Sequence, residues 1–202
     1  MIALIDIGIS NINSVAKALK YLGSEYKVVK DANALGHCSK IILPGVGSFA
    51  VAYAKLEQSG LKSKLLNSVL DDKKPFLGIC LGMQLIGKNS EEGDGSQGLG
   101  LIDAETQRIP DHIQIKIPHV GWNDIDHDGL GLFRDIKPKA DFYFVHSYRM
   151  VLCDKSIKCF YTVHGEKIIA YVEKGNIYGA QFHPEKSQSD GLRLLKNFSE
   201  LC

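Results

Sequence analysis

The sequence Pro75-Phe76-Leu77-Gly78-Ile79-Cys80-Leu81-Gly82-Met83-Gln84 combines an apolar, strand-like run, a sharp turn and the start of a helical pattern. Cys80 stands at its centre, with Gly78 two residues before it and Gly82 two residues after it. This layout is typical of a nucleophile elbow, in which a strand turns abruptly into a helix. Cys80 would then lie at a helix N-terminus, whose dipole and free N–H groups favour a thiolate. A buried strand cysteine followed by an ordinary loop is the alternative, because free cysteines often serve only as small core residues.

Outward from this segment, the N-terminal part of the chain alternates short apolar runs with segments of helical spacing. Such alternation predicts an α/β fold whose mostly parallel sheet is covered by helices on both faces. The expected strands span Ile2–Ile7, Tyr26–Val29, Lys40–Leu43 and Phe76–Ile79. The expected helices are Asn11–Leu22, a segment that begins at Phe49 with Ser48 as its cap, and Leu61–Leu70.

After Glu91 the pattern changes to a polar loop, Glu91–Gly98, and a series of shorter strands. These predict an antiparallel or mixed region in the C-terminal half, before a final helix over Gln188–Leu201. No linker, internal repeat or low-complexity segment divides the chain, so we expect residues 1–202 to form a single domain. The strands expected here are Gln114–Ile117, Phe142–Val145, Ser147–Val151, Lys158–Val163, Ile168–Glu173 and Ile177–Gln181.

Composition and charge narrow the classes of function. The 202 residues include 24 basic and 23 acidic side chains, a formal net charge of +1, and no basic block that would indicate a nucleic-acid or membrane-surface partner. No segment approaches the ~20 apolar residues of a membrane span, and the N-terminus lacks the features of a signal peptide. The cysteines are scattered, without a metal-binding spacing, so we expect a reduced, soluble, cytoplasmic protein that uses no metal and no cofactor.

A second set of reactive side chains stands near the C-terminus, in Gln181-Phe182-His183-Pro184-Glu185. Residues two apart in a strand project from the same face, so His183 and Glu185 would point the same way, and Pro184 restricts the backbone between them. A histidine oriented by a carboxylate is the base half of a nucleophile–base–orienter arrangement. The alternative is a partly exposed histidine beside a surface glutamate.

The turn Pro44-Gly45-Val46-Gly47 directly follows a predicted strand. Its glycines allow the backbone to direct N–H groups toward a ligand without interference from a Cβ. Together with the Leu81 N–H, this turn would form an oxyanion hole. An ordinary strand-to-helix turn is the alternative.

Other stretches rich in aromatic residues and histidine leave their roles open. Tyr143-Phe144-Val145-His146-Ser147-Tyr148 would line a pocket or form a core strand, and Pro118-His119-Val120-Gly121-Trp122-Asn123 would form an interface or pack internally. Four further histidines are interpreted as surface or loop residues: His37, His112, His127 and His164. The cysteines without an elbow are interpreted as structural: Cys38, Cys153, Cys159 and Cys202.

The segment Gly78–Gln84, followed far downstream by Phe182–Glu185, resembles the class I (triad) glutamine amidotransferases, in which cysteine, histidine and glutamate occur in this order. Further motifs are similar to the glutaminase subunit of imidazole glycerol phosphate synthase. The resemblance spans nearly the whole chain and implies a flavodoxin-like three-layer α/β sandwich. The additional motifs are Pro44-Gly45-Val46-Gly47-Ser48-Phe49, Pro118–Asn123, Tyr143–Tyr148 and His183–Gln188.

The resemblance implies a role for each matching residue. Cys80 would attack the side-chain amide of glutamine, His183 would move the protons, and Glu185 would orient His183, with a γ-glutamyl thioester as the intermediate. The oxyanion would be held by backbone N–H groups of Gly45, Val46, Gly47 and Leu81. Glutamine would be held by Gly47, Gln84, Glu92, His146, Ser147 and Tyr148, with Glu92 pairing its α-ammonium group.

In the family, the partner is a separate (β/α)₈ barrel, the cyclase subunit of histidine biosynthesis, which receives the ammonia. The positions that face this barrel and the ammonia route are Asn11, Trp122, Tyr143 and Lys186. Such subunits usually open with Asp-Tyr-Gly and a glycine-rich turn before Asn, whereas this chain has Asp6-Ile7-Gly8-Ile9-Ser10-Asn11. This departure leaves a paralogous glutaminase subunit, serving a sugar amidotransferase of surface polysaccharide biosynthesis, as the alternative. A stand-alone cysteine peptidase or γ-glutamyl hydrolase is the alternative enzyme class.

Overall fold

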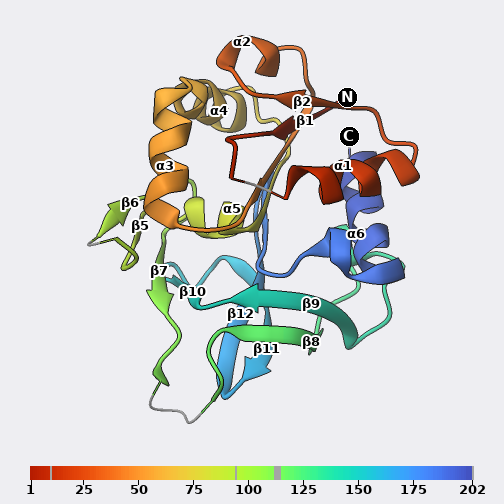
Figure 1. Ribbon diagram of the computed structural model, residues 1–202. Helices are drawn as coiled ribbons and strands as arrows, with labels where there is room; N and C mark the ends of the chain where they lie inside the picture. Colours follow the sequence, from red (N-terminus) through yellow and green to blue (C-terminus); the bar gives the residue numbers. More distant parts are fainter. Residues whose placement is uncertain (10, 94, 112–114, 202) are drawn as a thin grey trace.

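A seven-stranded sheet forms the centre of the molecule, in the order β11-β12-β13-β4-β3-β1-β2 (Figure 1). The computed structural model describes residues 1–9, 11–93, 95–111 and 115–201. The strands from β13 to β2 run parallel to one another, whereas β12 and β11 add an antiparallel edge. This confirms the predicted α/β class with a mostly parallel sheet. The strands span Ile2–Ile5 (β1), Tyr26–Val29 (β2), Lys40–Gly45 (β3), Phe76–Cys80 (β4), Lys158–His164 (β11), Glu166–Lys174 (β12) and Ile177–Ala180 (β13).

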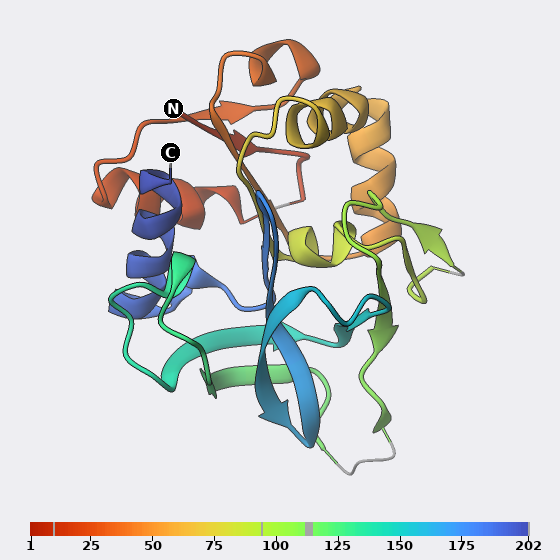
Figure 2. The same cartoon turned by 180° about the vertical axis from the view of Figure 1, so that it is seen from behind.

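Helices cover both faces of this sheet, because its central strands are apolar on both sides. In β1, Ala3 and Ile5 face one apolar cluster, and Ile2 and Leu4 face the other. Figure 2 shows the two helical layers on opposite sides of the sheet. The first layer contains α2 (Ala32–Leu35), α3 (Phe49–Gln58), α4 (Leu61–Leu70) and α5 (Leu81–Leu85). The second layer contains α1 (Ile12–Tyr21) and α6 (Gln188–Glu200).

Two smaller sheets extend the C-terminal half, as the change of pattern after Glu91 predicted. One has the strand order β10-β7-β5-β6, and the other pairs β8 with β9 in an antiparallel hairpin-like ribbon. The β8–β9 ribbon lies beside α6 and the 3₁₀ helix η3 (Pro184–Lys186) (Figure 1). The strands span Asn89–Ser90 (β5), Ser96–Gln97 (β6), Ala104–Arg108 (β7), His119–Ile125 (β8), Ala140–His146 (β9) and Tyr148–Leu152 (β10).

Several local predictions in this region were wrong. No strand forms at residues 115–117, and residue 114 of that predicted strand lies outside the described residues. Strand β7 was missed because its buried side chains are Ala104 and Thr106, which give only a weak apolar alternation. Strand β8 was missed for a similar reason, since His119 is buried while Trp122 faces outward. The predicted polar loop Glu91–Gly98 contains the short strand β6.

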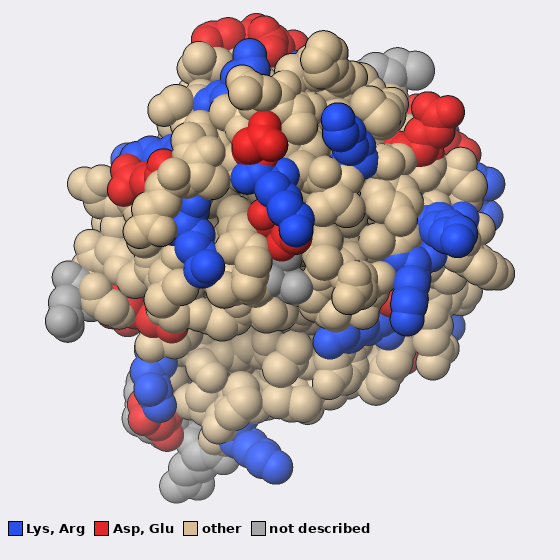
Figure 3. All heavy atoms as spheres, turned by 45° about the horizontal axis from the view of Figure 1, so that its top comes forward, with Lys and Arg blue, Asp and Glu red and all other residues tan. Residues whose placement is uncertain are grey.

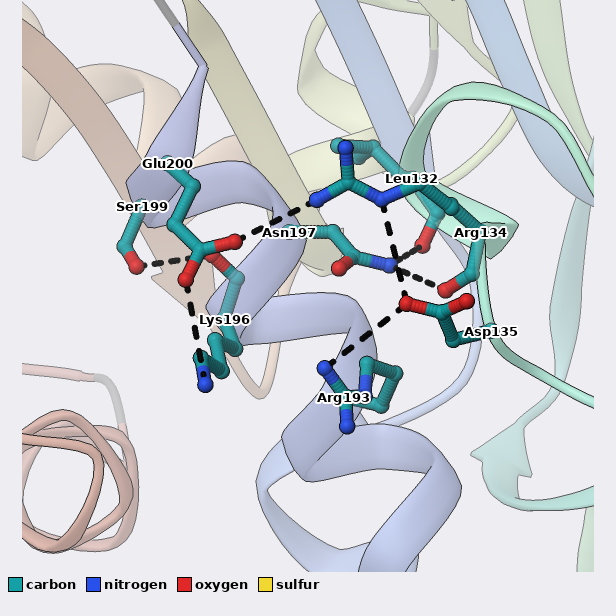
Figure 4. Close-up of polar contacts among 8 residues, drawn as sticks. All are labelled: Leu132, Arg134, Asp135, Arg193, Lys196, Asn197, Ser199 and Glu200. Carbon is teal, nitrogen blue, oxygen red and sulfur yellow. Dashed lines mark hydrogen bonds and ion pairs between the residues drawn. The ribbon is translucent and has the colours of Figure 1, made fainter.

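The C-terminal helix holds the segment that connects β8 with β9. Asn197 of α6 is buried and donates through Nδ2 to the carbonyls of Leu132 at 2.9 Å and Arg134 at 2.7 Å (Figure 4). Leu132 belongs to the 3₁₀ helix η2 (Gly131–Phe133). The surrounding ion pair of Arg134 with Glu200 at 3.3 Å is exposed and contributes little to stability, so Asn197 is the main polar anchor.

Charged side chains of both signs occur on the face of the molecule that Figure 3 draws. On the face drawn in Figure 3, basic and acidic side chains lie among a larger number of uncharged residues. Among the described residues, no helix has the length and hydropathy that crossing a bilayer requires.

Candidate active site

Cys80 lies at the junction of β4 and α5, in the sharp turn that the sequence predicted. Its backbone has φ 54° and ψ −108°, a left-handed conformation that side-chain-bearing residues rarely adopt. A Cβ on Gly78 would lie 2.5 Å from the carbonyl oxygen of Gly82, and a Cβ on Gly82 would lie 1.8 Å from that of Leu43. Only glycine therefore fits at both positions, and β3, β4 and α5 approach one another closely around the cysteine.

The Cys80 thiol is nearly buried and touches two polar groups of neighbouring segments. Its Sγ lies 3.8 Å from the carbonyl oxygen of Val145 and 3.8 Å from Nε2 of Gln181. Cys80 itself is 6% exposed. The Gln181 contact was not predicted, although Gln181 precedes His183 by two residues, a spacing that places both side chains on the same side of an extended chain.

His183 and Glu185 form a buried pair beside this cysteine. Nδ1 of His183 lies 2.8 Å from Oε1 of Glu185, and the two side chains are 2% and 1% exposed. Nε2 of His183 makes no hydrogen bond of normal geometry, but Cys80 is close enough to affect the titration of the ring. With Nδ1 held by the carboxylate, Nε2 is the nitrogen left to exchange a proton with the thiol.

The charge of His183 is controlled by its two partners. Burial alone would lower its pKa, but the hydrogen bonds and charges of Cys80 and Glu185 together outweigh burial and raise the pKa from 6.5 to about 10. The imidazolium is therefore the stable form at neutral pH, and a positively charged partner is what a catalytic thiolate requires.

A cavity of about 340 Å³ opens beside Cys80. Every residue that the resemblance assigned to glutamine binding lines this cavity. Gly45 does not line it, because it is the last residue of β3 and is buried against Leu81. The lining residues are Val46, Gly47, Cys80, Leu81, Gln84, Glu92, Pro118, Val145, His146, Ser147 and Tyr148.

These features agree with the comparisons of the chain with known proteins. The model of the class-I glutamine amidotransferase family matches residues 3–201. The chain belongs to this family. It is 44% identical to imidazole glycerol phosphate synthase subunit HisH 1 of Campylobacter jejuni (strain RM1221), over 100% of both chains. It is 45% identical to subunit HisH of Moorella thermoacetica, covering 99% of this chain and 94% of the relative.

Solved structures of the family confirm the fold of this amidotransferase. The crystal structure of a glutamine amidotransferase superposes with a TM-score of 0.78 at 20% identity, covering 98% of this chain and 96% of the other. The crystal structure of a putative GMP synthase component from Thermoplasma acidophilum superposes with a TM-score of 0.74 at 18% identity, covering 98% and 91%. The predicted flavodoxin-like α/β sandwich is thus correct.

Within the amidotransferase cavity, Gln84 is already hydrogen-bonded to the protein. Its Nε2 donates to the carbonyl of Tyr148 and to Oε1 of Gln181, each at 3.1 Å, and the residue is 5% exposed. Gln84 therefore braces α5 against β10 and the residues that follow β13. Both hydrogens of its amide nitrogen are used in this way, so only its oxygen is left for a ligand.

Glu92, which also lines the cavity, is held by a helix N-terminus. Its Oε2 accepts a hydrogen bond from the Phe49 N–H at 3.0 Å, at the first residue of α3. The positive end of the helix dipole stabilises a carboxylate at this place. The cavity consequently carries negative charge at Glu92, on the side where a ligand cation would be favoured.

The predicted oxyanion turn has one N–H already engaged. The Val46 N–H donates to the carbonyl of Ile9 at 3.3 Å, so in this conformation it does not serve a ligand in the cavity. Leu81 is the first residue of α5, so its N–H has no partner within the helix. Gly47 has φ +95°, which glycine adopts without strain.

The residues predicted to face a partner are brought together in large part. Trp122 and Tyr143 face each other across β8 and β9, with ring centroids 5.9 Å apart, and Nζ of Lys186 lies 5.6 Å from the Tyr143 ring centroid. Trp122 remains 48% exposed. Asn11 stands at the start of α1, which packs against η3, the 3₁₀ helix that contains Lys186.

His127 lies in the loop after β8, in agreement with its interpretation as a surface or loop residue, but it is buried there. It is 8% exposed, its Nε2 lies 3.0 Å from the carbonyl of Lys137, and its ring packs against Phe133. His164 is partly exposed but belongs to β11 and stacks on His119. His112 lies outside the described residues.

Among the described cysteines other than Cys80, exposure differs, and none has a positive φ like that of Cys80. Cys38 is buried, Cys153 is exposed, and Cys159 is half-buried, while Cys202 lies outside the described residues. In the part of the chain that the structure describes, no group of three or more His, Cys, Asp or Glu side chains is arranged to hold a metal ion.

Proposed function

We propose that this chain, as a single domain over residues 1–202, is the glutaminase subunit of an imidazole glycerol phosphate synthase. It would hydrolyse glutamine to glutamate and pass the ammonia to a cyclase-type (β/α)₈ barrel subunit in histidine biosynthesis. The observation that carries the proposal is the buried Cys80, His183 and Glu185 beside a cavity lined by all the residues expected to hold glutamine. Relatives of that name, 44–45% identical over nearly their full length, support it.

In the proposed reaction, Sγ of Cys80 attacks the carboxamide carbon of glutamine. In the resting ion pair the thiol proton already lies on Nε2 of His183, and the imidazolium gives it to the departing nitrogen as the C–N bond breaks and ammonia leaves. The remaining γ-glutamyl thioester is hydrolysed by water, with His183 acting as the base. Glu185 keeps Nε2 directed at the reacting atoms by holding Nδ1, and it stabilises the imidazolium.

Negative charge develops on the amide oxygen during the attack and needs backbone donors. We assign the Leu81 N–H and the turn of Gly45, Val46 and Gly47 to this role, since donors of this kind are worth about 10²–10³ in rate each. Because the Val46 N–H is engaged by Ile9, that residue joins the oxyanion hole only after the bond is given up.

Glutamine fits the charge of the cavity. Its α-ammonium group would pair with Glu92, whose carboxylate is partly exposed and fixed at the start of α3. The backbone of His146–Tyr148 and the Gly47 peptide offer hydrogen-bonding groups along the cavity wall, and Gln84 offers its amide oxygen. The side-chain amide would then reach Cys80, which lines the same cavity.

The partly exposed aromatic pair Trp122 and Tyr143 suggests where the barrel subunit would bind. Ammonia reacts only in its neutral form, so it must pass to the synthase without equilibrating with water. We place the partner contact at Trp122, Tyr143 and Lys186, with Asn11 at the edge, next to the triad. We further propose that the complex is cytoplasmic.

The decisive experiment measures glutaminase activity of the chain alone and with the cyclase-type barrel from the same source. Amide-¹⁵N glutamine and the acceptor nucleotide are supplied, and Cys80→Ala serves as the control. Transfer of ¹⁵N to imidazole glycerol phosphate, absent in the control, supports the proposal. Stimulation by a sugar-modifying synthase instead would assign the chain to that paralogous branch, which the unusual Asp6–Asn11 stretch keeps open. High activity of the isolated chain on γ-glutamyl peptides would indicate a stand-alone hydrolase.

A further inference from the structure

Behind the glutamine cavity lies a series of hydrogen-bonded side chains that the proposed reaction does not use. We propose that His119 is a positioning residue for glutamine binding, which acts through His146 to fix the cavity wall formed by residues 146–148. The inference rests on the proposed function, because glutamine is the ligand whose binding it describes. The series runs from Tyr148 through His146 and His119 to Asn123.

The hydrogen bonds determine which nitrogen carries each proton. Nδ1 of His146 lies 2.8 Å from the Tyr148 carbonyl, which can only accept, so His146 carries its proton on Nδ1. Its Nε2 must then accept, and its neighbour at 3.0 Å, Nδ1 of His119, must donate. Nε2 of His119 accepts in turn from Nδ2 of Asn123 at 3.3 Å. A single arrangement of protons therefore satisfies the whole series while both rings are neutral.

The surroundings keep these rings neutral. His119 and His146 are 3% and 6% exposed. Burial lowers the pKa of both residues, with a smaller contribution from His164, to about 4 for His119 and about 3 for His146. Neither ring therefore takes up a second proton near neutral pH, and no positive charge arises on His146, which lines the cavity.

Stacking holds His119 in the orientation that its hydrogen bonds require. The Phe144 ring lies nearly parallel to it with centroids 4.8 Å apart, and the His164 ring with centroids 4.1 Å apart. Two parallel rings this close must occupy opposite faces, so the His119 imidazole lies between them. His164 also connects to the cavity, because its Nε2 bonds the Lys116 carbonyl at 2.9 Å, two residues before the lining residue Pro118.

The other end of the series reaches the cavity directly. The Tyr148 carbonyl accepts from Nδ1 of His146 and from Nε2 of Gln84, and all three residues line the cavity. Ser147 lies between the two bonded residues, and its own carbonyl accepts from the Ile109 N–H at 2.9 Å. The wall is thus held from both sides, and His119 supplies the only donor to Nε2 of His146 among the described residues.

Two substitutions separate the hydrogen bond from the stacking. His119→Phe keeps a flat ring between Phe144 and His164 but removes the donor. His119→Asn retains a donor at the position of Nδ1 but removes the ring. His127→Phe is the matched control, because it removes a histidine that is also buried and hydrogen-bonded but does not line the cavity.

Steady-state glutaminase kinetics of the full chain with its barrel subunit should show a split between KM and kcat. We expect His119→Phe to raise KM for glutamine about tenfold, the scale of one lost buried hydrogen bond, with kcat changed less than about twofold. His119→Asn should stay within about threefold of the unaltered protein by the same reasoning. His127→Phe should lower stability but leave KM unchanged. An unchanged KM in His119→Phe, or an equal rise in both histidine-to-phenylalanine variants, overturns the proposal.

A spectroscopic measurement does not depend on activity. Long-range ¹H–¹⁵N correlation spectra of histidine-labelled protein distinguish the two neutral tautomers. His146 should show the Nδ1–H tautomer, and its Nε2 resonance should move toward that of an unbonded ring nitrogen in His119→Phe. An Nε2–H tautomer of His146 refutes the inference even if the protein is an active glutaminase. Absent glutaminase activity with the expected tautomers would instead count against the proposed function alone.

Discussion

The backbone strain at Cys80 predicts that replacing this proposed nucleophile by glycine instead of alanine costs less stability than an alanine-to-glycine change at an unstrained buried position. Cys80 has φ 54° and ψ −108°, and a conformation of this kind costs about 1–3 kcal/mol for a residue with a Cβ. Glycine removes that cost. However, glycine lowers stability by about 0.5–1 kcal/mol because the unfolded chain gains backbone entropy. Relative to alanine it also loses about 0.8 kcal/mol of contact made by the buried methyl group. Cys80→Gly should therefore range from about 0.8 kcal/mol less stable to about 1.7 kcal/mol more stable than Cys80→Ala.

The comparison with alanine is essential because both variants lack the thiol, so the loss of the sulfur cancels between them. Ala180 provides the control position, since it is fully buried in β13, pairs with Ile79 and has no positive φ. Ala180→Gly should lower the free energy of unfolding by about 1–2 kcal/mol, from the same entropy and contact losses without any strain to relieve.

Equilibrium urea unfolding, followed by circular dichroism, measures the unaltered protein and these three variants under the same conditions. The strain stored at the elbow is the difference between the two alanine-to-glycine changes, about 1–3 kcal/mol. If Cys80→Gly is less stable than Cys80→Ala by as much as Ala180→Gly is destabilised, the turn stores no strain. The reasoning from the dihedral angles would then be wrong.

Three further predictions concern the same site. Gly82→Ala should prevent folding or lower the free energy of unfolding by more than about 3 kcal/mol, because its Cβ would meet the Leu43 carbonyl at 1.8 Å. Expression and urea unfolding test this, and a normally stable variant would refute the close packing. Glu185→Gln should reduce kcat less than Cys80→Ala or His183→Ala does. It should also lower the pKa of His183, because the neutral amide no longer stabilises the imidazolium. pH–rate profiles test this, and a larger loss of kcat than in Cys80→Ala would contradict the orienting role. Lowering the pH from about 7 to about 5 should reduce the free energy of unfolding by about 2 kcal/mol for each of His119 and His146. The reason is that their pKa values in the folded protein lie below 6.5, so the unfolded chain binds more protons over this range. Urea unfolding at both pH values should show a loss about 2 kcal/mol smaller in His119→Phe.

The catalytic elbow was predictable because its information is local. Gly78 and Gly82 stand next to the atoms they must avoid, and the strand, turn and helix are encoded within one short segment. The parallel sheet was predictable for a related reason, since apolar runs such as Ile2–Ile5 are buried on both faces. Strands whose inward positions hold small or polar side chains, such as β7 and β8, gave no comparable periodicity.

Contacts between distant residues were not predictable in the same way. Gln84 and Gln181 are 97 positions apart, yet they share a hydrogen bond beside the nucleophile. The burial of His127 depends on Phe133 and the Lys137 carbonyl, which reach it through the irregular segment between β8 and β9. A single sequence gives the chemistry of such side chains but not their neighbours.

The contact between Val46 and Ile9 links the predicted oxyanion turn to the stretch Asp6–Asn11, whose sequence differs from the pattern expected of such subunits. The Ile9 carbonyl accepts the N–H of Val46, and Ile9 also packs against the apolar cluster beneath α3 and α4. A substitution in the stretch from Asp6 to Asn11 that shifts this carbonyl would therefore change which N–H groups the cavity receives, even without touching Cys80, His183 or Glu185. A change in that stretch would therefore affect both the proposed oxyanion turn and the edge proposed to face a partner.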